Sequence, residues 1–139
     1  MLIKENYFQK EEGSTAVEFA LISLVFLTVV LGIMEAGRLF WTQNAIQYAV
    51  EEASRVALVA EDFNADEIET AASESLEDMM ISATGLTVDA VTITENDIDY
   101  VEIDATYQYT AIVNAFLPES LSSIELQASA RRPLVWEND

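Results

Sequence analysis

A glutamate at the head of a long apolar run is the feature that most constrains this chain. Residues 19–34 contain no charged side chain, and residues 14–17 extend this stretch to about the 20 residues that a helix needs to cross a bilayer. Glu18 lies near its start. Burying a carboxylate costs roughly 2.5–3.5 kcal/mol at the bilayer centre and less near its edge. A simple anchor gains nothing from that charge, so the sequence predicts a membrane helix whose Glu18 has a partner.

Gly13 stands five positions before Glu18 and suggests what the partner is. If the chain is cut between Gly13 and Ser14, the new ammonium group at Ser14 can attract a carboxylate strongly in a low dielectric. An alternative is structural: Thr15 followed by Glu18 matches a capping box, which would give Glu18 an ordinary role at the start of a helix. The two roles are compatible.

The flanks of the apolar run predict the arrangement in the membrane. We expect residues 1–13 to be a short cytoplasmic leader, residues 14–35 a transmembrane and assembly helix, and residues 36–139 an extracytoplasmic stem and head. Lys4 and Lys10 favour a cytoplasmic N-terminus, and the segment after the run lacks the small-x-small site of a signal peptide. Glu35 and Arg38, three residues apart, predict an ion pair at the membrane boundary.

Composition excludes several classes of function. The chain of 139 residues has no Cys and no His, which removes the usual zinc sites, thiol nucleophiles and histidine triads, and we expect no cofactor. Its net charge of −19 argues against a nucleic acid partner. Acidic residues between 97 and 104 lack the spacing of a calcium loop, so we interpret them as a solvated strand face.

Periodicity predicts two helices. The first should run from Ser14 to about Ala60, continuing beyond the membrane as an amphipathic stem. Its apolar positions are Leu39, Ile46, Val50, Ala53, Ala57 and Ala60, and its wet face carries Gln43, Gln47, Glu51, Glu52 and Arg55. Asn64 with Glu67 predicts the start of a second helix, which should extend to about Ser82 and stop at Gly85. Its apolar side is formed by Ile68, Ala72, Leu76, Met79 and Met80.

Strict alternation then predicts three strands, at residues 86–94, 99–109 and 123–131. Residues 95–97 form a hairpin turn, and Phe116, Leu117 and Pro118 break the chain before the third strand. One dry face of this sheet needs a cover, which the stem and the second helix can supply. We therefore expect an α+β fold: a long N-terminal helix, a second helix and a three-stranded antiparallel sheet.

With these features in place, the sequence resembles TadE-like minor pilins of the tight-adherence branch of the type IV pilus superfamily. The specific part of the resemblance is residues 13–55, and weaker similarity extends over most of the chain. The matching residues are Gly13, Ser14, Ala16, Val17, Glu18, Phe19 and Ala20, then residues 32–40, Asn44, Ala45, Ala49, Ala53 and Arg55, and finally Tyr107, Tyr109, residues 116–118 and residues 126–132.

The resemblance implies a pilin-like fold and a structural function. In this family a membrane aspartic prepilin peptidase cuts after the glycine, here between Gly13 and Ser14, so the protein is a substrate and not an enzyme. Processed subunits enter an adhesive pilus through their N-terminal helices, and Glu18 would help subunits to dock. The implied partners are the inner membrane, the prepilin peptidase, other pilin subunits and the pilus assembly platform. The sizeable head favours a minor subunit, located in the membrane and, after assembly, in the surface pilus.

Two departures from the family pattern stand beside this resemblance. Many members have a proline shortly after the glutamate, where this chain has Leu24, and many leaders are more basic. The competing hypothesis is a single-pass, membrane-anchored periplasmic binding or assembly module that is never cut. A small enzyme is a third hypothesis, which the absence of His, Cys and glycine-rich loops disfavours.

Overall fold

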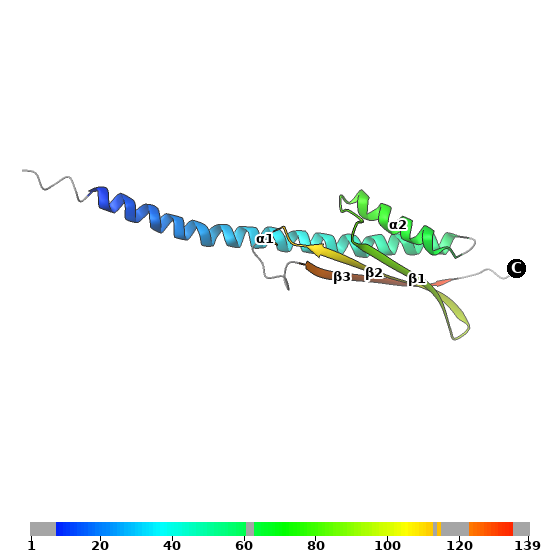
Figure 1. The fold of residues 1–139 in the computed structure, drawn as a ribbon. Helices are drawn as coiled ribbons and strands as arrows, with labels where there is room; N and C mark the ends of the chain where they lie inside the picture. The colour runs from blue at the N-terminus through cyan, green and yellow to red at the C-terminus, as the bar shows by residue number, and fades with distance from the viewer. Residues whose placement is uncertain (1–7, 61–62, 113, 115–122, 135–139) are drawn as a thin grey trace, which may run out of the picture. The chain divides into compact units, whose positions relative to one another are not determined.

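The computed structural model describes residues 8–60, 63–112, 114 and 123–134. They form helices α1 (Phe8–Val59) and α2 (Ala65–Asp78) and strands β1 (Leu86–Glu95), β2 (Ile98–Thr110) and β3 (Ser123–Leu134), shown in Figure 1. The predicted α+β fold, with two helices and a three-stranded antiparallel sheet, is confirmed. The chain divides into two compact units, residues 1–37 and residues 38–139. The predicted chain break at residues 116–118 lies outside the described residues.

Helix α1 begins earlier than predicted, at Phe8 and not at Ser14. The residues that follow Phe8 include Gln, Lys and Glu, which are good helix formers, and they carry the helix through Gly13. In the uncut chain, Thr15 therefore lies inside α1 and cannot be its N-cap. The capping-box interpretation of Glu18 is wrong for this form of the protein.

The sheet has the order β1-β2-β3, with both pairs antiparallel. Glu95 pairs with Ile98 across a two-residue turn, in which Asn96 and Asp97 have φ values of 53° and 62°. Positive φ at both central residues is the signature of a type I′ hairpin turn, whose twist matches that of the flanking strands. The predicted hairpin is thus confirmed, with each strand slightly longer than expected.

The core of the second unit lies between the inner face of the sheet and the two helices. Residues 38–59 of α1 lie within the stem predicted to begin at residue 36, and their buried face contacts α2 and the sheet (Figure 1). Ile46, Val50, Ala53 and Ala57 are buried as predicted. The other buried members are Ala45, Ala49, Ile68, Ala72, Leu76, Val101, Ile103, Ala105, Tyr109, Leu126, Ala128 and Leu134. The sheet therefore has one dry face, covered by helices as the alternation requires.

The start of α2 was predicted correctly, because the Asn64 side chain accepts a hydrogen bond of 3.1 Å from the backbone N–H of Asp66. Its end was not. The helix stops at Asp78, and Met80 takes φ 60°. The N–H groups of Met80 and Ile81 donate to the carbonyls of Glu77 and Leu76, at 2.8 and 3.2 Å.

These two bonds are those of a Schellman motif, with Met80 in the left-handed position that glycine usually occupies. Ile81 and Leu76 also belong to the same apolar cluster, which is the contact that commonly accompanies this motif. Met80 is turned outward and is 97% exposed, so its predicted place on the apolar side of α2 is wrong. Gly85, the predicted stop, instead directly precedes β1, and its φ is not positive.

Candidate functional site

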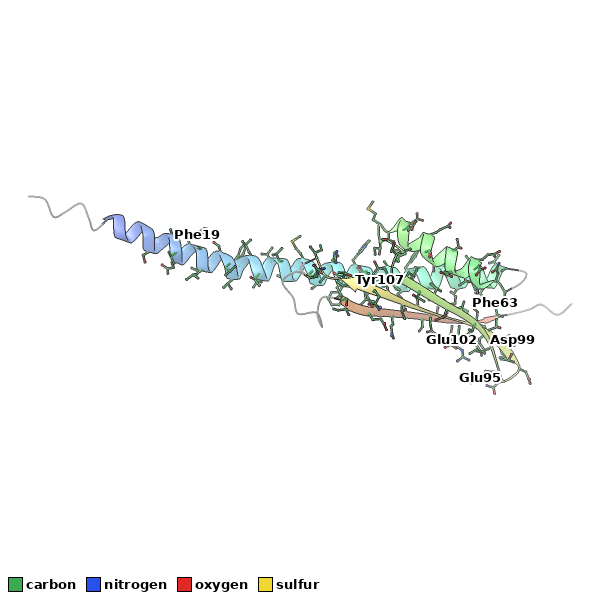
Figure 2. The ribbon with its side chains drawn as sticks, viewed as in Figure 1. Phe19, Phe63, Glu95, Asp99, Glu102 and Tyr107 are labelled. Atoms are coloured by element: carbon green, nitrogen blue, oxygen red, sulfur yellow. The ribbon has the colours of Figure 1, made fainter. Side chains whose placement is uncertain are left out.

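The apolar part of α1 has no cover from the rest of the described chain. Within the described residues, one helical segment, Gly13–Val59, is long and apolar enough to cross a membrane, and its most apolar window is 0% buried. Phe19, labelled in Figure 2, is 72% exposed. A row of uncovered Leu, Val, Ile and Phe side chains is unfavourable in water, so this segment requires lipid or other protein chains around it.

Gly13 and Ser14, the predicted processing site, are both exposed and lie inside α1. A Cβ atom built on Gly13 would meet nothing within 4 Å. Glycine in a helix interior is roughly 1 kcal/mol less favourable than alanine. Neither packing nor local backbone conformation therefore accounts for a glycine at this position.

Glu18, the predicted assembly residue, is exposed on the same helix. In the part of the chain that the structure describes, no hydrogen bond or ion pair reaches its carboxylate. At Leu24, where many TadE-like proteins have a proline, α1 is continuous. The Thr28 hydroxyl donates a 2.8 Å hydrogen bond to the Leu24 carbonyl. Processing at residues 13 and 14 and docking through Glu18 remain predictions.

Arg38, predicted to form an ion pair with Glu35, binds the end of strand β2. Its Nε donates to the hydroxyl of Tyr109 at 2.9 Å, and its Nη2 donates to the Thr110 carbonyl. The guanidinium carbon lies 4.8 Å from the centre of the Tyr109 ring. Tyr109 is only 3% exposed, so this contact fixes the beginning of the stem to a core residue of the head. The pair with Glu35 remains a prediction.

Sequence reasoning missed this contact. The sequence identifies Tyr109 only as part of a tyrosine-containing strand, and Arg38 and Tyr109 are 71 positions apart, so no local signal indicates that they meet. The alternation of β2 does place Tyr109 on the inner face together with Val101, Ile103 and Ala105. An apolar-face tyrosine needs a partner for its hydroxyl, which is the one clue that the sequence offered.

Gln43 and Gln47, predicted to lie on the wet face of the stem, bind the edge of the sheet. The Gln43 amide donates to the carbonyl of Gln127 at 2.8 Å, and the Gln47 amide donates to the carbonyl of Ser129 at 3.4 Å. Gln127 and Ser129 lie two residues apart on β3, so their carbonyls point to the same side of that strand. Both glutamines are half-buried, in contrast to the exposed Glu51 on the same helix.

The acidic residues near the hairpin do not converge on one point. Asp99 accepts a 2.6 Å bond from the Thr94 hydroxyl, whereas Glu102 lies on the opposite face of β2. Glu95, at the hairpin end in Figure 2, binds Arg131, whose guanidinium carbon lies 4.4 Å from the Tyr100 ring centre. Among the described residues, no group of three or more acids is placed to hold a metal ion.

A family model described as TadE-like protein matches residues 13–55. The match begins at Gly13 and covers the apolar run and most of the stem, so the predicted resemblance is confirmed over these residues. No curated protein and no solved structure matches the chain.

Proposed function

From the premise that residues 13–55 are TadE-like, we propose that this protein is a pilin-like structural subunit of a tight-adherence pilus. It is cut between Gly13 and Ser14 by a prepilin peptidase, held in the inner membrane by α1, and incorporated as a minor subunit. The match beginning at Gly13 carries the proposal. The protein is then a substrate of the peptidase and has no catalytic role of its own.

The position of the cleaved bond supports a role for glycine in recognition. Because the Gly13–Ser14 bond lies inside α1, the helix must open there before a peptidase can reach the backbone. Glycine favours opening, since it is roughly 1 kcal/mol poorer than alanine in a helix. It also leaves the backbone without a side chain beside the cut.

Cutting this bond supplies the charge that Glu18 lacks in the uncut chain. The new α-amino group at Ser14 has an ordinary pKa of about 7.7–8.0 and is mostly protonated at neutral pH. A carboxylate and an ammonium group attract strongly in a low dielectric, and either one left unpaired there is costly. In the proposed pilus, Glu18 of one subunit pairs with the ammonium group of a neighbour.

N-terminal sequencing tests the cut. The full chain is produced with and without a prepilin peptidase, and the N-terminus and intact mass are measured. We expect a product that begins at Ser14, abolished by Gly13→Ala. Gly32→Ala is the matched control, because Gly32 is also exposed in α1 and has nothing within 4 Å of a built Cβ. A chain that stays full-length with the active peptidase would instead favour the uncut membrane-anchored module, which the unbroken helix at Gly13 also suits.

A second measurement isolates Glu18. Glu18→Gln keeps the size of the side chain and removes its charge, so we expect normal insertion and cutting but no recovery of the subunit in purified pili. Pili that contain the Glu18→Gln variant at wild-type levels would refute the docking role.

A further inference from the structure

The end of the second unit where the stem begins contains a hollow of about 600 Å³. Arg38 and Trp41 of the stem, Met79 and Met80 after α2, and Tyr107 near the end of β2 line it. We call these five residues the base of the head. Trp41 is 59% exposed and Met80 is 97% exposed, so two large apolar side chains face outward together. Because both side chains line the same hollow, this end of the head is a candidate for contact with a partly apolar surface.

Charge sets this hollow apart from the rest of the protein. The chain has 25 acidic residues among 139, yet none of the twelve residues that line the hollow, all in the described part of the chain, is acidic. Its charged side chain is Arg38, a cation. The base of the head is therefore a place where a strongly acidic protein can approach a phosphate group.

The position of the base along α1 identifies the occupant. Met34 ends the apolar run, and Arg38 and Trp41 follow it by only four and seven residues in the sequence. The headgroup layer adds roughly 5–8 Å on each side of the hydrocarbon core. Trp and Tyr rings, and the charged ends of Arg, favour this layer.

We propose that the base of the head docks on the interface of a zwitterionic phospholipid bilayer, with Arg38 near the lipid phosphates and Trp41 and Met80 among the headgroups. The net charge of −19 excludes an anionic surface as the preferred partner. The inference rests on membrane insertion, one part of the proposed function, and does not depend on cutting or on pilus assembly.

Depth-dependent fluorescence quenching tests the docking. The full chain is placed in phosphatidylcholine vesicles that contain lipids brominated near the headgroup end of their acyl chains. Single-tryptophan proteins are made in a Trp136→Phe background: native Trp41, and Met80→Trp, Phe26→Trp or Val59→Trp, each combined with Trp41→Phe. Phe26 lies in the apolar run and reports insertion. Val59 is 83% exposed at the far end of α1 and is the matched control for an exposed head residue.

We expect the bromolipid to reduce the fluorescence at positions 26, 41 and 80 at least twofold and to leave position 59 unchanged. Quenching at 26 with full fluorescence at 41 and 80 would place the base of the head in water and overturn the docking, while membrane insertion would stand. Equal quenching at 59 and 80 would show adsorption of the whole head and would also overturn it. No quenching at 26 would refute insertion itself, and both proposals would fail.

Discussion

Replacing Met80 with glycine should stabilise the head, because Met80 holds a backbone conformation that glycine adopts freely. Its φ is 60°, a region where a residue with a Cβ atom is roughly 1–2 kcal/mol less favourable. The side chain is 97% exposed, so its removal loses almost no packing. Glycine's extra freedom in the unfolded chain offsets roughly 0.5–1 kcal/mol of the gain. The expected net increase in the free energy of unfolding is about 0.5–1 kcal/mol.

Thermal unfolding of the full chain in detergent micelles, followed by near-ultraviolet circular dichroism, measures this change. For a unit of about 100 residues, the gain corresponds to a rise in Tm of roughly 2–6 °C. Met80→Ala is the control, because it removes the same side chain and keeps the Cβ atom. A glycine variant that melts no higher than the alanine variant would refute the reasoning and would show that the left-handed turn is not strained.

Three further predictions concern contacts of the second unit, each measured as a change in the free energy of unfolding by denaturant. In a double-mutant cycle, Arg38→Lys and Tyr109→Phe should fall short of additivity by about 0.5–1.5 kcal/mol, and additive effects would mean that their contact contributes nothing. Asp97→Gly should stabilise the hairpin by about 0.5 kcal/mol, because glycine suits the second position of a type I′ turn, and a destabilised variant would contradict that turn type. Gln43→Ala should lose about 0.5–1.5 kcal/mol, whereas the exposed control Glu69→Ala should change stability little, and equal effects would dismiss the Gln43 bond to β3.

Local signals predicted the fold well because each element has a strong periodicity. The alternation of β2 placed Val101, Ile103 and Ala105 on the dry face, and all three are buried. Asn64 marked the start of α2, since a short polar side chain can satisfy a free N–H only at a helix end. The end of α2 could not be read in this way. Two backbone hydrogen bonds and the apolar cluster that contains Leu76 and Ile81 stabilise the left-handed conformation that Met80 by itself disfavours. None of these contacts is visible in the composition.

The sequence offers a hypothesis for the local part of the candidate site, which stays a prediction, and it offers none for the long-range contacts. Gly13, Glu18 and the apolar run are neighbours along the chain, so their spacing, together with residues 35–38 just beyond the run, leads to the pilin resemblance. The bonds from Arg38 to Tyr109 and from Gln43 to Gln127 join residues 71 and 84 positions apart. Such contacts depend on the register of the sheet and on which face of the stem packs against it. Polar residues at the border of an amphipathic face can point either to solvent or to the sheet.

The glutamines of the stem affect how readily the edge strand β3 can pair with another copy of the chain. A strand at the edge of a sheet offers its backbone groups to any similar strand nearby, and proteins confined to a membrane meet their own copies often. Gln43 and Gln47 occupy the carbonyls of Gln127 and Ser129, and further along β3 Pro133 has no N–H to offer. A second copy of this chain therefore finds fewer backbone groups available along this part of β3, which disfavours pairing of two sheets through this edge.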